Sequence, residues 1–125
     1  MSEAETKSVV VLGASNNPDR YSFKAICALR EHGYAVIPIH PALDEIQGID
    51  VVASVKEVHQ PVDTVSLYVN PSILGKLLDD LVDLSPRRVL FNPGTESAEA
   101  VKVLEEAGIQ CENACTLVLL QTGQF

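Results

Sequence analysis

The sequence is poor in the residues that crosslink chains or bind metals. It has no tryptophan, one methionine and three cysteines in 125 residues. Cys27, Cys111 and Cys115 are odd in number and lack the spacing of a disulfide framework, so we expect reduced thiols. Cys111 and Cys115 lie four residues apart, but no second Cys or His pair accompanies them, which argues against a zinc site. The cysteines are expected to pack as small apolar residues.

Positive charge and long apolar runs are also scarce. Nine Lys and Arg residues stand against seventeen Asp and Glu residues, and the formal net charge is −8. This charge repels nucleic acid and anionic membranes, and no apolar run approaches the roughly 20 residues of a membrane-spanning helix. The N-terminal "MSEAETKS" is unlike a secretory signal or a transit peptide. We therefore expect a cytoplasmic protein that binds neither nucleic acid nor a membrane.

Apolar residues are plentiful, at 46% of the chain, and they occur in short segments. Continuous apolar runs predict buried strands, whereas helical spacing of apolar residues predicts the helices between them. Residues 40–50 are expected to be a loop, followed by a short apolar segment and one helical turn at 55–58. The main strands are predicted at 8–12, 34–39, 62–69 and 87–91, and the helices at 21–32, 71–84 and 96–107. Such alternation predicts one doubly wound α/β domain with a Rossmann-like parallel sheet and a core at about residues 8–120.

The stretch "LGASNN" after the first strand is the most informative candidate site. Ligands of open parallel sheets bind beyond the carboxyl ends of the strands, where the strand order reverses. Gly13 permits a tight turn there, and Ala14 and Ser15 leave room for a ligand. The amides that lead into the next helix then form an anion site, with Ser15 and Asn16 as further donors and Arg20 and Lys24 as nearby cations. The alternative is a tight strand-to-helix turn without a ligand.

An ordinary dinucleotide site is disfavoured by two features. The G-x-G-x-x-G pattern fails after Gly13, because Ser15 and Pro18 occupy the second and third glycine positions. The second strand ends at His40, where an acidic residue would bond the adenosine ribose. An imidazole tolerates a phosphorylated ribose better than a carboxylate does. The alternative for His40 is a solvated loop histidine.

The ordered set "VVVLGASNNPDRYSFKA", "HGYAVIPIHP", "VDTVSLYVNP", "RVLFNPGT" and "ENACTLV" resembles the CoA-binding domain family over residues 8–120. These small proteins are similar to the CoA-binding part of the succinyl-CoA synthetase α subunit and of ADP-forming acyl-CoA synthetases. The resemblance implies that coenzyme A or an acyl-CoA is bound through its ADP moiety. The positions that it assigns to the site are Gly13, Ala14, Ser15, Asn16, Arg20, Tyr21, Ser22, His40, Pro41, Val69, Asn70, Pro71, Asn92, Pro93 and Gly94.

Within that set, the resemblance assigns the pyrophosphate to residues 13–15 and the adenosine ribose to His40 and Pro41. Residues 69–71 would flank the adenine or the pantetheine. Two segments depart from the family pattern. The family often has Lys or Arg after the second strand, suited to the 3′-phosphate of CoA, whereas this chain has "HPALDE". The loop that is often "WLQLG" is "FNPGT" here. Cys115 is placed where a pantetheine thiol would end, although a buried small residue is the alternative.

We expect a binding domain without chemistry of its own, acting as a carrier, a sensor or a partner of an enzyme. The phosphohistidine of the acyl-CoA synthetases lies in a domain that this sequence lacks, and no acidic residue is spaced to orient any of the three histidines. Two other functions stay open: a diverged NAD(P)-dependent reductase, and a protein-interaction module of the same fold without a ligand. The apolar C-terminal "CTLVLLQTGQF" also predicts a homodimer.

Overall fold

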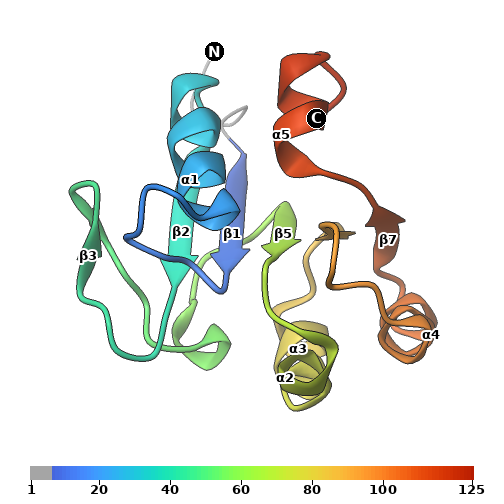
Figure 1. Cartoon of the computed structure of the whole chain (residues 1–125). Helices are drawn as coiled ribbons and strands as arrows, with labels where there is room; N and C mark the ends of the chain where they lie inside the picture. Colours follow the sequence, from blue (N-terminus) through green and yellow to red (C-terminus); the bar gives the residue numbers. More distant parts are fainter. Residues whose placement is uncertain (1–6) are drawn as a thin grey trace.

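The computed structural model describes residues 7–125 and contains a five-stranded parallel sheet (Figure 1). The strands lie in the order β2-β1-β5-β6-β7. Their bounds are β1 (Ser8–Leu12), β2 (Ala35–Ile39), β5 (Thr64–Leu67), β6 (Arg88–Phe91) and β7 (Gln110–Asn113). All neighbouring pairs in this sheet are parallel, which confirms the predicted doubly wound α/β fold. The expectation about the N-terminal segment rests mainly on residues 1–6, which lie outside the described residues.

Helices cover both faces of the sheet (Figure 1). α1 and α5 contact each other on one face, and α2, α3 and α4 pack together on the other. Their bounds are α1 (Tyr21–Glu31), α2 (Pro71–Gly75), α3 (Leu78–Leu84), α4 (Ala98–Glu106) and α5 (Thr116–Gln121). None of the helices within residues 7–125 is both long and apolar enough to cross a membrane.

The residues of β1 alternate between the two faces, as the twofold repeat of a strand requires. Val9 and Val11 pack toward α1, whereas Val10 and Leu12 pack toward α2, α3 and α4. All four side chains are buried, so β1 lies in the centre of the domain. Residues 9–12 are all apolar because β1 is buried on both faces of the sheet.

Two local expectations were wrong, and a third was confirmed. Residues 71–84 form two helices, because the regular helical hydrogen-bond pattern is interrupted after Gly75, a residue of low helix propensity. The amides of Lys76 and Leu77 donate to the carbonyls three residues back, those of Ile73 and Leu74. The expected loop 40–50 contains an antiparallel hairpin, β3 (Glu45–Ile46) and β4 (Ile49–Asp50). Its turn uses positive φ at Gln47 and Gly48, as a tight two-residue connection requires. The expected single turn at 55–58 is present as the 3₁₀ helix η2 (Val55–Glu57).

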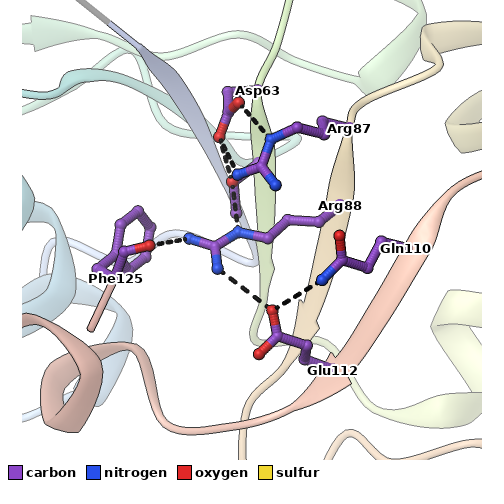
Figure 2. Close-up of polar contacts among 7 residues, drawn as sticks. Asp63, Arg87, Arg88, Gln110, Glu112 and Phe125 are labelled. Atoms are coloured by element: carbon purple, nitrogen blue, oxygen red, sulfur yellow. Dashed lines mark hydrogen bonds and ion pairs between the residues drawn. The ribbon is translucent and has the colours of Figure 1, made fainter.

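A polar cluster lies on the α5 side of the sheet, over β5, β6 and β7 (Figure 2). The guanidinium of the buried Arg88 donates to Thr64 Oγ1 at 2.9 Å, to Glu112 Oε2 at 3.3 Å and to the Phe125 carbonyl at 2.8 Å. It also lies 4.5 Å from the centre of the Phe125 ring. Arg88 thereby joins the sheet to the segment that follows α5.

Candidate functional site

A large cleft lies where the strand order reverses. The chain leaves β1 toward β2 and later returns to the other side of β1 as β5, so this switch point lies between β1 and β5. A cavity of about 1000 Å³ opens there, at the carboxyl ends of these strands. Its walls come from the segments after β1, β2 and β5, and from α2. This is the position that the predicted fold gave for a ligand.

Gly13 allows the turn after β1 to pack against the end of β5. Its φ is +92°, and a Cβ added there would lie 2.9 Å from the carbonyl carbon of Tyr68 and 3.0 Å from its oxygen. A side chain at this position would therefore collide with backbone that cannot move aside. The glycine serves the close approach of two backbone segments as well as the turn itself.

The amides after Gly13 differ in availability. The Ala14 amide donates to the Ile39 carbonyl at 3.1 Å, so it is used within the protein. Among the described residues, no hydrogen-bond acceptor reaches the amides of Ser15 and Asn16. Ser15 Oγ accepts from the Asn17 amide at 3.0 Å, which holds the turn in shape. The amides after Gly13 that stay free for an anion are therefore those of Ser15 and Asn16, and not that of Ala14.

The start of α1 lies next to these free amides. Arg20 occupies the N-cap position without a capping side-chain bond, and α1 has no acidic residue in its first turn. The cleft is therefore lined by the uncapped end of an eleven-residue helix, with Arg20, Tyr21 and Ser22 in its wall. Such an end attracts anions through its free amides and its dipole.

Arg20 is the one Lys or Arg among the described residues that line the cleft. Lys24, the second cation expected from the sequence, does not line it; its Nζ lies 5.6 Å from the centre of the Tyr21 ring. Asp19 lines the cleft next to Arg20, so the local positive charge is partly balanced.

His40 organises the loop after β2. Its Nδ1 accepts from the Ala42 amide at 3.0 Å and from the Leu43 amide at 3.1 Å. Since Nδ1 accepts both bonds, the neutral ring carries its proton on Nε2, which stays available as a donor. His40 and Pro41 both line the cleft, on the side where the adenosine end of a dinucleotide would lie.

The structure brings eleven of the fifteen predicted site residues to the cleft. They are Gly13, Ala14, Ser15, Asn16, Arg20, Tyr21, Ser22, His40, Pro41, Val69 and Pro93. Asn70 instead caps α2 through the Ile73 amide at 2.9 Å, and Pro71 is the first residue of that helix. Gly94 is exposed, and its amide donates to Glu96. Asn92 is buried and lines a separate, smaller cavity.

Several residues of the cleft were not singled out in the sequence. Tyr68 is the most informative, because burial raises the pKa of its hydroxyl, a rise that the nearby hydroxyls of Ser66 and Thr116 partly offset. In the sequence it stands inside an apolar strand pattern, so it gave no sign of facing a cleft. The other missed residues contribute mostly apolar walls: Leu12, Asp19, Ile39, Leu43, Ala53, Ser54, Val55, Ile73 and Leu77.

A model of the "CoA binding domain" family matches residues 7–121. The "Uncharacterized protein YneT" of Bacillus subtilis (strain 168) is 30% identical over 103 residues, covering 82% of this chain and 76% of that protein. The "Acetate--CoA ligase [ADP-forming] II subunit alpha" of Pyrococcus furiosus is 33% identical over 73 residues, covering 58% of this chain but only 16% of the subunit.

The fold is also found among solved structures. The crystal structure of an uncharacterised protein superposes with a TM-score of 0.91 at 38% identity, and the match covers 96% of this chain and 98% of that one. The family match thus spans nearly all of the described fold, including every strand of the parallel sheet. The chain belongs to the CoA-binding domain family.

Proposed function

We propose that this protein binds coenzyme A or an acyl-CoA through its ADP moiety in the cleft between β1 and β5, and that it has no chemistry of its own. The observation that carries the proposal is the pair of unoccupied amides at Ser15 and Asn16, next to the uncapped start of α1. Backbone amides suit a diphosphate in a chain of net charge −8, because they attract anions locally. The domain would act in the cytoplasm as a carrier, a sensor or a partner of an enzyme.

The walls of the cleft favour one direction for the ligand. The adenosine would lie beside His40 and Pro41 after β2, and the diphosphate would lie at the 15–16 turn. The pantetheine arm would then pass Tyr68 and Val69 at the end of β5, toward Pro93. This direction gives the cationic and amide-rich part of the cleft to the phosphates and the more apolar part to the pantetheine.

Isothermal titration calorimetry with CoA tests the proposal directly. Thermal unfolding with CoA, NADP and NAD tests the alternatives, because a ligand at a hundred times its Kd stabilises the fold by about 2.7 kcal/mol. Stabilisation by CoA alone is expected. Stabilisation by NADP alone would replace the proposal with a diverged reductase, and no response to any nucleotide would favour a protein-interaction module.

Arg20→Gln is the sharper variant for this site. Loss of a charge-assisted hydrogen bond to phosphate, about 1.5–3 kcal/mol, should weaken CoA binding by roughly tenfold or more. Arg30→Gln is the matched control, since Arg30 lies at the opposite end of α1 and donates to the Gln47 carbonyl. Equal affinity of both variants for CoA would contradict the proposed phosphate site.

Gly13 is unsuitable as a binding test, because its substitution strains the fold. Gly13→Ala should destabilise the protein by about 1–2 kcal/mol from positive φ alone, with the contact against Tyr68 added to that. Gly94→Ala is the control: its φ is +95°, yet a Cβ there meets no atom within 4 Å among the described residues. Urea unfolding should therefore show a clearly larger loss for Gly13→Ala, and equal losses would contradict the close approach.

The 3′-phosphate of CoA provides a separate test. Arg20 lies after β1 and would serve the diphosphate, whereas the cleft wall after β2 consists of His40, Pro41 and Leu43. We expect 3′-dephospho-CoA to bind within about threefold of CoA, less than the effect of one charge-assisted bond. Calorimetry with both ligands measures the difference. A tenfold loss would show a phosphate contact that this geometry does not provide.

The predicted homodimer stays a prediction. Val118 on α5 is 51% exposed, which leaves an apolar side chain at the surface of this helix. Single exposed apolar residues are normal on monomers, so this exposure by itself does not favour a dimer. Light scattering of the purified protein measures the oligomeric state.

A further inference from the structure

A second cavity of about 250 Å³ adjoins the cleft on the side of β6 and α5. Tyr21, Tyr68 and Pro93 line both the cleft and this cavity, so the two share a wall. The remaining lining residues are Asn92, Cys115 and Leu117. The second cavity therefore continues the cleft away from β2.

The walls of the second cavity are uncharged in the described part of the chain. The one amide side chain, that of Asn92, is committed to the protein. Its Nδ2 donates to Ser66 Oγ and to the Leu67 carbonyl, both at 2.9 Å. Its Oδ1 accepts from the Thr116 amide at 2.8 Å. A carboxylate that entered this cavity would lose part of its hydration and would meet no cationic side chain there, only the hydroxyls of Tyr21 and Tyr68, whereas an apolar group would need no partner.

The second cavity also lies at the end of the ligand path. The adenosine end is expected beside β2, and the second cavity lies beyond β5, at the end of β6. β2 and β6 are separated by three strand spacings, or roughly 14 Å. A ligand laid across the sheet in this direction would bring the group that ends its pantetheine arm to the second cavity.

We propose that the second cavity binds the acyl group of a short, uncharged acyl-CoA. This inference rests on the proposed function and adds the class of acyl group. The volume corresponds to about eight water molecules, so it admits a short acyl chain and excludes most of a long fatty chain. The uncharged wall discriminates against an acyl group that ends in a carboxylate.

Calorimetry with a series of thioesters tests the acyl preference. From acetyl-CoA to butyryl-CoA, affinity should rise by up to roughly fourfold for each added methylene, as the chain leaves water. Succinyl-CoA, of the same chain length as butyryl-CoA but with a terminal carboxylate, should bind at least about tenfold more weakly than butyryl-CoA. Palmitoyl-CoA should bind no more tightly than butyryl-CoA. Equal affinity of CoA, acetyl-CoA and butyryl-CoA would overturn the inference.

Leu117→Trp provides a variant that fills the second cavity. It should abolish the advantage of butyryl-CoA over CoA while the affinity for CoA itself is kept. Val118→Trp is the matched control, because Val118 is the next residue of the same helix and is exposed. A butyryl advantage that survives Leu117→Trp in a folded variant would overturn the assignment of the acyl group to this cavity.

Cys115 reports occupancy in the unmodified protein, so the test does not depend on a variant that folds. Cys115 lines the second cavity, whereas Cys27 on α1 lines neither cavity. Saturating butyryl-CoA should slow alkylation of Cys115 by iodoacetamide more than saturating CoA does, with Cys27 unaffected. Equal protection by both ligands would overturn the inference and leave CoA binding intact. If neither ligand binds, the proposed function fails, and this inference fails with it.

Discussion

The two faces of the parallel sheet are both buried, yet they are built from different chemistry. On the face toward α2, α3 and α4, each central strand contributes apolar residues, and Phe91 and Leu67 are fully buried there. On the opposite face, apolar residues of β1 pack beneath α1. Farther along that face, near α5, the polar Thr64, Ser66 and Arg88 are buried beside the apolar Leu90.

We infer that one face mainly stabilises the domain, whereas the other mainly fixes the position of α5. Apolar burial is non-directional, so the face toward α2, α3 and α4 stabilises the domain without fixing one precise arrangement. Hydrogen bonds are directional, and those near α5 fix where that helix begins: Ser66 Oγ lies 2.8 Å from Thr116 Oγ1. Because the start of α5 contributes Cys115 and Leu117 to the second cavity, the polar region sets the shape of the candidate acyl site.

Phe91→Ala should cause the largest loss of unfolding free energy, since it removes a buried aromatic ring from the face toward α2, α3 and α4. Deletion of a fully buried aromatic ring costs about 3–5 kcal/mol, which combines lost transfer energy with the cavity left behind. Val118→Ala is the control, because that side chain is 51% exposed and its loss should stay within about 0.5 kcal/mol. Urea unfolding measures both. A loss below about 1 kcal/mol for Phe91→Ala would show that this face is not the main source of stability.

Arg88→Met should have an intermediate effect, confined to the polar region. It removes three donated hydrogen bonds and leaves the buried Thr64 hydroxyl without its donor, at a cost of about 1–3 kcal/mol. Hydrogen exchange should rise in α5 and stay unchanged in α3 and α4. Alkylation of Cys115 should accelerate as the start of α5 loosens. Uniform acceleration of exchange across all helices would contradict a local role for Arg88.

The sequence predicted the parallel sheet because every main strand is a buried apolar run bounded by turn residues. It also predicted where the cleft lies, since the switch point follows from the order of strands and helices. The turn at Gly13 and the loop at His40 could be identified because both follow directly after strands. Both segments follow a recognisable strand, and ligands of parallel sheets bind at the carboxyl ends of strands, so both were expected to line the cleft.

The polar region and the second cavity were not predictable, because they depend on contacts between distant residues. Asn92 looked like a ligand contact after β6, yet its side chain bonds to Ser66, 26 residues away, and to Thr116, 24 residues away. Arg88 and Tyr68 were not singled out in the sequence. A hydrogen bond between side chains that are distant in the sequence leaves no local pattern or motif from which it could be predicted. The hairpin at 45–50 was missed because each of its strands has only two residues.

The smallest effect is expected from Arg87, the exposed neighbour of Arg88. Arg87 Nε donates to Asp63 Oδ1 at 2.8 Å, and this bond, together with that from Thr64, lowers the pKa of Asp63 (Figure 2). The Arg87 side chain is 50% exposed, so Arg87→Gln should cost less than about 1 kcal/mol at pH 7. Arg87 and Arg88 would thus contribute differently to the free energy of unfolding, because only Arg88 is buried.

The pH dependence of this pair distinguishes an ion pair from simple packing. A carboxyl whose folded pKa lies below its unfolded value of about 3.9 stabilises the fold at higher pH, and the contribution disappears as pH falls through the folded pKa. The difference in unfolding free energy between the wild type and Arg87→Gln should therefore be constant from pH 8 to about 5 and shrink below about 4. Urea unfolding across this range measures it. A difference that persists unchanged at pH 3 would mean that Arg87 acts through its aliphatic stem, and then the contrast with Arg88 would rest on packing rather than on charge.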